Sequence, residues 1–272
     1  MLTGHPPKFH GTRDNLQRPT NGDVYRGELD EESATVFVPG GPGHRQSGGI
    51  EATDTLLVVA NGNEGGATVY DRATGELVAR FSTGLGDQSN VNDVALAPNG
   101  DAYLTDFELS KIYRIPAVEL ERADTKVRKL PVFLDLTGTG FVAGSGSANG
   151  IVATPDGRFL LVVHYGYGEL HRIRLSDKEV TRVDLHGERL LSPDGMVLKD
   201  DVLYVVEYEA SDVAAIGMSN CYLSGEVLSR MTDPAFVCPT TDDVVDDRLL
   251  VVNSQFCGPG EPPFTVVSIP LP

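Results

Sequence analysis

Four short runs of apolar residues with nearly the same letters recur along this chain, and they restrict its fold more than any other feature. Each run is four or five residues long and rich in Leu and Val, which is typical of buried strands rather than of helices. The runs are Thr55–Val59, Phe159–Val163, Val202–Val206 and Leu249–Val252. Their recurrence predicts an internal structural repeat built from β-strands.

The copy around residue 150 shows the whole repeating unit. Residues 149–157 form a first strand that ends in a Pro-Asp-Gly turn, Phe159–Val163 form the second, and residues 169–175 and 179–185 supply two more. Other copies, 44 to 57 residues apart, start at Gly48, Asn92, Asp194 and Asp242. Four-stranded units with this spacing are typical of β-propeller blades. With part of a further blade near the N-terminus, they predict an all-β fold, a six-bladed β-propeller of four-stranded blades.

The first of these blades is expected to be incomplete or irregular. Residues 21–29 and Thr35–Val38 resemble its third and fourth strands, whereas residues 1–20 carry no apolar strand pattern. We therefore expect an irregular N-terminal segment over residues 1–20 and a single propeller domain over residues 21–272. A charged insertion from Ala117 to Lys129 lengthens one repeat and is predicted to form one helical turn on the rim.

Charge and composition argue against several classes of partner. The chain has 39 Asp and Glu against 22 Lys and Arg, a net charge of −17, whereas nucleic acids and anionic membranes attract basic surfaces. No apolar run approaches the ~18 residues of a membrane span. Met1–Thr20 lack the apolar stretch of a signal peptide, which predicts a cytoplasmic protein as given, or a secreted one if the native start lies upstream. The expected partner is a small molecule, with neither nucleic acid nor membrane.

The three cysteines, Cys221, Cys238 and Cys257, have no metal-binding spacing such as C-x-x-C. Without an export signal they are predicted to be free thiols. Cys238 precedes the last inner strand and Cys257 follows the strand after it, so these two are expected to be neighbours on the pocket face of one blade.

The starts of the inner strands are the first candidates for a functional site, because in a propeller they form a ring around one mouth of the central channel. The ring predicted here consists of Gly48, Asn92, Asn149, Asp194 and Asp242. Amide and carboxyl oxygens suit a hard cation such as Ca²⁺. The alternative is that the Asn-Gly and Asp-Gly pairs only form turns. The predicted metal ligands are Asn92, Asn149, Asp194 and Asp242.

The loops that join the second and third strands open on the same face as this ring. They mix polar and aromatic side chains, which suits a pocket for a small organic molecule; the alternative for each aromatic residue is packing within its own loop. Of these loop residues, only His164 is expected to titrate near neutral pH. The predicted substrate-binding residues are Asn92, Phe107, His164, Tyr165, Tyr167, Tyr208 and Phe256.

The register of Asn92, Asn149 and Asp194 resembles that of the senescence-marker-protein/gluconolactonase (regucalcin-like) family. Two motifs around these residues carry the resemblance, Ser-Ala-Asn-Gly-Ile-Val-Ala-Thr-Pro-Asp-Gly and Ser-Pro-Asp-Gly-Met. That family is related to paraoxonase and to strictosidine synthase-like propellers, and the resemblance extends over residues 21–269. It implies a six-bladed propeller that hydrolyses a lactone or phosphotriester with Ca²⁺ or Zn²⁺. It also implies that Asn149 and Asp194 bind the metal, that Asn92 binds metal or substrate, and that Asp194 is a general base or nucleophile. The family's remaining ligand, a Glu on the first inner strand, has no counterpart before Asn21, and Asp242 is the candidate to replace it.

Three classes of function follow from this reading. The first is a metal-dependent hydrolase of a lactone or related small ester, with Asp194 as the catalytic residue and Ca²⁺ as the cofactor. The second is a metal-independent propeller enzyme of secondary metabolism, such as a lyase, isomerase or condensing enzyme. The third is a non-catalytic propeller that binds a ligand or a protein. The sequence contains no Ser-His-Asp pattern, Gly-x-Ser-x-Gly elbow or phosphate-binding loop.

Overall fold

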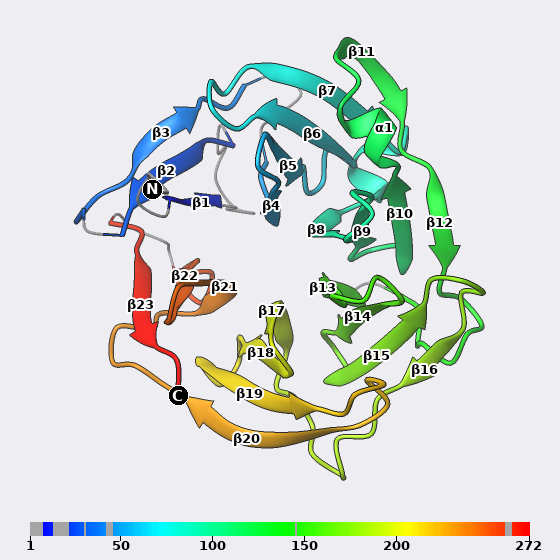
Figure 1. The fold of residues 1–272 in the computed structure, drawn as a ribbon, viewed down its shortest axis with the longest axis vertical. Coiled ribbons are helices and arrows are strands. Elements are labelled where there is room, and N and C mark those ends of the chain that lie inside the picture. The colour runs from blue at the N-terminus through cyan, green and yellow to red at the C-terminus, as the bar shows by residue number, and fades with distance from the viewer. Residues whose placement is uncertain (1–7, 13–21, 30, 42–45, 145, 259–262) are drawn as a thin grey trace, which may run out of the picture.

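The computed structural model describes residues 8–12, 22–29, 31–41, 46–144, 146–258 and 263–272, the first of these segments by its backbone alone. Strands account for nearly all of the regular structure, and in the described residues they form six sheets arranged around a central axis (Figure 1). The all-β propeller predicted from the repeats is therefore confirmed. No helix in these segments is long and apolar enough to cross a membrane.

The sheets follow one another around the axis in chain order. The first contains β1 (Lys8–Thr12), β2 (Val24–Glu28) and β3 (Thr35–Val38). The second contains β4 (Ile50–Ala52), β5 (Leu56–Ala60), β6 (Gly66–Asp71), β7 (Leu77–Ser82) and β11 (Asp124–Lys129). The third contains β8 (Val91–Leu96), β9 (Ala102–Asp106), β10 (Lys111–Ile115) and β12 (Val132–Asp135).

The other three sheets are continuous in sequence. The fourth contains β13 (Ala148–Ala153), β14 (Phe159–His164), β15 (Glu169–Arg174) and β16 (Val180–Arg182). The fifth contains β17 (Pro193–Lys199), β18 (Val202–Glu207), β19 (Asp212–Met218) and β20 (Gly225–Met231). The last contains β21 (Pro239–Val245), β22 (Arg248–Asn253) and β23 (Val266–Pro270). The described helices are a 3₁₀ turn, Gly86–Gln88, and α1 (Ala117–Leu120).

The structure corrects the expectation of six four-stranded blades. Among the described strands, three sheets have four strands, one has five, and the first and last have three each. The N-terminal strand β1 hydrogen-bonds to β2 rather than to β23, so it does not supply a fourth strand to the last sheet. The first and last sheets, with three strands each, are therefore neighbours around the axis without sharing a strand (Figure 1).

The structure also has a strand, β1, before residue 21, where an irregular segment was expected. β1 pairs with β2 from Lys8 opposite Glu28 to Thr12 opposite Val24, and it lies beside the inner strand β4 of the next sheet. The backbone hydrogen bonds of an antiparallel pair do not require a particular side-chain pattern. This strand consequently left no apolar alternation in the sequence.

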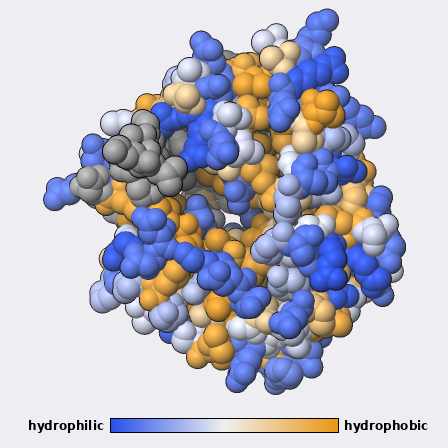
Figure 2. Space-filling model, viewed as in Figure 1, coloured by the Kyte–Doolittle hydropathy of each residue, from blue (hydrophilic) through white to orange (hydrophobic). Residues whose placement is uncertain are grey.

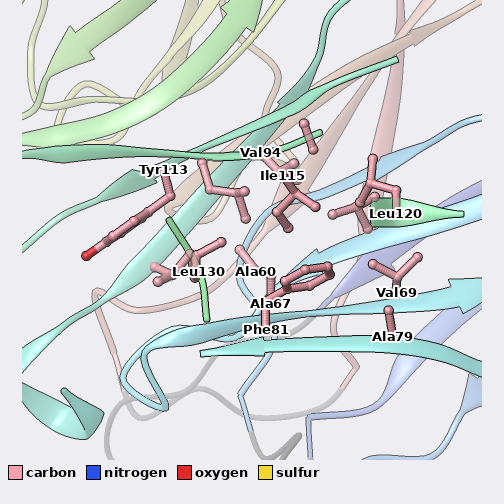
Figure 3. Close-up of a cluster of buried hydrophobic side chains, with 14 of the residues drawn as sticks. Ala60, Ala67, Val69, Ala79, Phe81, Val94, Tyr113, Ile115, Leu120 and Leu130 are labelled. Carbon is pink, nitrogen blue, oxygen red and sulfur yellow. The ribbon is translucent and has the colours of Figure 1, made fainter. Parts of the chain in front are cut away.

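The repeated apolar runs are the second strands, and both of their faces are buried between neighbouring sheets. Every residue of β5 and β14 is buried, which explains why these runs are continuous rather than alternating. Figure 3 shows one of the resulting clusters, in which Val69 and Phe81 of the second sheet pack with Tyr113 and Ile115 of the third.

The charged insertion forms the single helical turn predicted for it, and it adds a strand. After α1, β11 pairs in parallel with β7 of the preceding sheet. The insertion therefore connects the outer edges of two neighbouring sheets (Figure 1).

Cys238 and Cys257 are neighbours, as expected, but they form a disulfide, with their Cα atoms 6.0 Å apart. This corrects the prediction of free thiols for that pair; Cys221 is free and exposed. The register explains the pairing, because Pro239 at the start of β21 lies opposite Asn253 at the end of β22. Cys238 directly precedes this pair. The backbone N–H groups of Ser254 and Gln255, shortly before Cys257, donate to the carbonyl oxygens of Cys238 and Val237, which keeps Cys257 close to its partner.

Candidate functional site

A cavity of about 1000 Å³ opens at one mouth of the central channel. Its lining comes from the starts of the inner strands, from the loops after the second strands, and from the first and last sheets. A cavity of this size is typical of sites for small molecules. Figure 2 shows the channel as a hollow at the centre of the molecule.

Asn92, Asn149 and Asp194 form a row on the floor of this pocket. The Nδ2 group of Asn92 donates to Oδ1 of Asn149 at 2.8 Å, and Nδ2 of Asn149 donates to the carbonyl oxygen of Pro193 at 3.4 Å. Asn149 also forms a side-chain hydrogen bond with Asp194. The structure thus brings together three of the four residues predicted as metal ligands.

A β-bulge places each member of this row. The strand register shifts around Asn92, around Asn149 and around Asp194, and a bulge redirects the side chains at the point where it occurs. Gly150, which follows Asn149, does not form a turn. A Cβ atom on Gly150 would lie 2.1 Å from the carbonyl oxygen of Asp194, so the close approach of two inner strands requires glycine there.

A second carboxyl group, Asp93, lies beside this row and was not identified from the sequence. Its Oδ2 atom accepts the backbone N–H of Ile151 at 3.0 Å, and burial raises its pKa to about 6. Burial, followed by the negative charge of Asp93, also raises the pKa of Asp194 well above its ordinary value. The charge of Asp93 on β8 therefore disfavours the ionisation of Asp194 on β17, although the inner strand β13 lies between them.

Aromatic side chains surround the floor on three neighbouring sheets. Phe107, Tyr165 and Tyr208 each follow the last residue of a second strand, and all three line the pocket. The ring centroids of Phe107 and Tyr165 are 5.5 Å apart, and those of Tyr165 and Tyr208 are 6.4 Å apart. We call these three residues the aromatic row. Phe256, also predicted to bind substrate, lines the pocket from the last sheet.

In five sheets, a buried polar residue at the end of the second strand directly precedes a loop residue that lines the pocket. We call this set the strand-end polar residues. Asp106, for example, accepts hydrogen bonds from the hydroxyl groups of Tyr113 at 2.8 Å and Ser89 at 2.6 Å. Glu207 accepts from the N–H of Leu191 and from Arg230. The set consists of Asn61, Asp106, His164, Glu207 and Asn253. These side chains fix the loops so that the next residue faces the pocket.

His164 belongs to this buried set and does not line the pocket. Its Nε2 lies 2.8 Å from the carbonyl oxygen of Val142, and its Nδ1 accepts the N–H of Tyr167 at 3.2 Å. Tyr167 is half exposed, packs edge-on against the His164 ring and also lies outside the pocket lining. The two residues position the loop that carries Tyr165.

Asp242, the fourth predicted metal ligand, lies farther along the channel. It lines a separate cavity of about 140 Å³ together with Glu51 and Asp243. Asp242 pairs with Val251 of the second strand β22, as Met196 pairs with Val205 in the preceding sheet. Asp242 is therefore equivalent to Met196 and not to Asp194. Thr240, rather than Asp242, lines the pocket at the mouth of the channel. The consecutive letters Asp242-Asp243 resembled the start of an inner strand but lie within it.

The first sheet also contributes to the pocket, which was not predicted from the sequence. Tyr25 and Glu28 of β2, and Glu31 and Glu32 in the turn before β3, line the outer part of the pocket. They come near the last sheet only because the propeller closes on itself. No local motif in the sequence could have indicated this.

The floor suits a hard cation by its donor chemistry. Among the described residues, no group of three or more His, Cys, Asp and Glu side chains is arranged to hold a metal ion. Asn92, Asn149 and Asp194 nevertheless offer two amide oxygens and one carboxylate within a single row, and oxygen donors of this type are those that Ca²⁺ prefers. The negative charge that Asp93 carries when ionised also favours a bound cation beside them.

Comparisons with known proteins support the fold. No family model matches the chain, and no curated protein matches it. A nidogen/laminin complex structure matches with a TM-score of 0.67 and 15% identity, covering 97% of this chain and 90% of that one. A protein of unknown function from Bacteroides caccae matches with a TM-score of 0.70 and 14% identity, covering 98% and 90%.

Two of the similar structures are enzymes. Virginiamycin B lyase from Staphylococcus aureus matches with a TM-score of 0.58 and 12% identity, covering 85% of this chain and 70% of that one. A streptogramin B lyase matches with a TM-score of 0.52 and 13% identity, covering 97% and 74%. At these identities the likeness concerns the fold alone. It supports the propeller fold, and the resemblance to gluconolactonases stays a prediction.

Proposed function

We propose that this propeller is an enzyme that hydrolyses a lactone or related small ester in the pocket, with Ca²⁺ held by Asn92, Asn149 and Asp194. The observation that supports it is the hydrogen-bonded row of these three side chains, set by three bulges on the floor of a pocket large enough for a small molecule. Enzymes occur among the similar structures, although those are lyases.

The residues of the pocket have distinct tasks in this reaction. A divalent cation bound by Asn92, Asn149 and Asp194 would supply a Lewis acid, the chemistry that polarises a carbonyl group and stabilises an oxyanion. Asn149 orients the carboxyl group of Asp194 through its hydrogen bond. Asp194 removes a proton from the attacking water, or attacks as nucleophile. The aromatic row packs against the apolar part of the substrate and limits the access of bulk water.

Asp194→Asn is the first test of this proposal, because it removes the carboxylate and retains the size of the side chain. We expect loss of lactone turnover and at least tenfold weaker Ca²⁺ binding by calorimetry, since a hard cation prefers a carboxylate. Asn149→Ala should weaken Ca²⁺ binding as well. Asp156→Asn is the matched control, because Asp156 stands in a similar Pro-Asp-Gly motif but accepts from Thr154 and Arg158 in a hairpin turn. Unchanged turnover and unchanged Ca²⁺ affinity in a folded Asp194→Asn protein would refute the hydrolase.

The paired carboxyl groups of Asp93 and Asp194 favour a second candidate, a metal-independent enzyme such as a lyase, isomerase or condensing enzyme. Burial raises the pKa of both, and the charge of Asp93 raises that of Asp194 further, so one group can serve as proton donor and the other as proton acceptor. Chelation separates the candidates, because EDTA should abolish a Ca²⁺-dependent hydrolysis and leave a carboxyl-only reaction unchanged.

A further inference from the structure

The pocket lining has an unusual balance of side chains. Five of its residues carry carboxyl groups: Glu28, Glu31, Glu32, Asp93 and Asp194. Six are aromatic: Tyr25, Phe107, Tyr165, Tyr208, Phe256 and Phe264. Among the described residues that line the pocket, none is Lys, Arg or His.

The carboxyl groups lie at both ends of the aromatic surface. At the floor, Asp194 is close enough to Tyr165 and Tyr208 for its negative charge to raise the pKa of both phenols, after the larger effect of burial. At the outer end, the exposed side chains of Glu31 and Glu32 stand in the turn that follows β2. A molecule in the pocket is therefore in contact with aromatic rings and has carboxyl groups on two sides.

The basic residue of β2, Arg26, offsets only part of this charge. Its guanidinium group lies 3.3 Å from the ring centroid of Phe37 and donates to the carbonyl oxygen of Arg72, and it also interacts electrostatically with Glu28. Glu31, Glu32 and the carboxyl groups of the floor make up the rest of the acidic lining. A negative, partly enclosed pocket concentrates cations and excludes anions.

Aromatic faces and carboxylates together match one ligand chemistry. The face of an aromatic ring attracts an ammonium group, most strongly for ligands whose charge is spread over methyl groups. A neutral ligand gains no charge attraction from this arrangement, and an anion is repelled.

We propose that the molecule bound in this pocket is an organic cation, a protonated or quaternary amine whose ammonium group lies against the aromatic row. This deepens the proposed function by naming the substrate class as amine-bearing, and it rests on that proposal only in using the same pocket. Binding itself requires neither turnover nor Ca²⁺.

A pair of probes of equal shape tests the inference. Choline and 3,3-dimethylbutan-1-ol differ in one atom, nitrogen against carbon, and hence in charge. In calorimetric titrations, with EDTA and again with Ca²⁺, we expect choline to bind at least tenfold more tightly than the alcohol. Choline binding should also weaken as salt is raised, because the attraction is electrostatic.

Variants of this protein locate the effect. Tyr208→Leu removes an aromatic face and keeps an apolar side chain, so it should weaken choline binding at least fivefold and leave the alcohol unchanged, while Tyr208→Phe restores the affinity. Glu32→Gln should weaken choline binding, whereas Glu226→Gln, which removes the same charge from the exposed face of β20, should not. Thermal unfolding verifies that each variant is folded.

The outcomes are distinct from those for the proposed function. Equal affinity for choline and the alcohol, or equal effects of Glu32→Gln and Glu226→Gln, would overturn the inference even if a lactone were hydrolysed. A preference for choline in a protein without lactone turnover would support the inference and count against the hydrolase.

Discussion

Asp242→Val should stabilise this protein. Asp242 is only 8% exposed, and neither of its carboxyl oxygens has a hydrogen-bond partner. The strand register places it where other inner strands have Ile50, Val94, Ile151 and Met196. An apolar side chain at that position therefore fits the architecture of the channel, whereas a carboxyl group does not.

The magnitude follows from the cost of burying an unpartnered polar group, about 1–3 kcal/mol in proteins. Val adds apolar contact, so we expect the free energy of unfolding to rise by about 2–4 kcal/mol. For a chain of this size, each kcal/mol raises the melting temperature by about 2–4 °C. Urea denaturation followed by circular dichroism measures the first quantity, and thermal unfolding measures the second.

The gain should depend on pH in a definite direction. Burial, followed by the charges of Asp243 and Asp93, raises the pKa of Asp242 well above its ordinary value. The folded protein thus holds a proton that the unfolded chain releases, and the wild type loses stability as pH rises toward the folded-state pKa. Asp242→Val has no such group, so its advantage should be larger at pH 8 than at pH 5.

Asp242→Asn, which removes the charge and remains polar, is expected to fall between the wild type and Asp242→Val. The reasoning is refuted if Asp242→Val is no more stable than the wild type at pH 8, or if its advantage is the same at both pH values. If Asp242 takes part in holding a cation, the Val variant will also lose any stabilisation that Ca²⁺ gives the wild type.

Two further substitutions test the close approach of the inner strands and the anchoring of the loops. Gly150→Ala should destabilise the protein by about 1–3 kcal/mol in urea denaturation, because the new methyl group meets the Asp194 carbonyl oxygen; Gly41→Ala, with open space around its Cβ position, is the control. Arg230→Met should lower the free energy of unfolding by about 2 kcal/mol, because it leaves the fully buried Glu207 without its charged partner. The partial exposure of Arg230 keeps this loss moderate. A variant whose stability lies within about 0.5 kcal/mol of the wild type, the usual range for surface substitutions, would contradict that role.

The repeat accounts for the part of the site that could be predicted from the sequence. Equivalent positions in successive blades face the same axis, so aligning the apolar runs was enough to place Asn92, Asn149 and Asp194 together. The same register placed Phe107, Tyr165 and Tyr208 near one another. These predictions needed only the period of the repeat and the order of strands within a blade.

The rest of the site depends on features that a repeat does not carry. Asp242 lies two positions deeper than expected, because the last inner strand has a different sequence before its start. Histidine is a common residue type in functional sites, but both ring nitrogens of His164 form hydrogen bonds to backbone groups of neighbouring loops. The acidic turn with Glu31 and Glu32 reaches the pocket through closure of the whole ring, over a sequence distance that no motif spans.

The strand-end polar residues also bear on how a pocket of this kind can diversify. Each secures its loop from the protein side, so the aromatic residue that follows in three of the blades can contribute to the pocket. Specificity is thereby separated from folding at Phe107, Tyr165 and Tyr208. A combinatorial library confined to these three positions would sample new ligands on an intact scaffold. Gly62 is better left unchanged because its φ of +52° favours glycine, and Ser254 because its hydroxyl group donates to the carbonyl oxygen of Cys238.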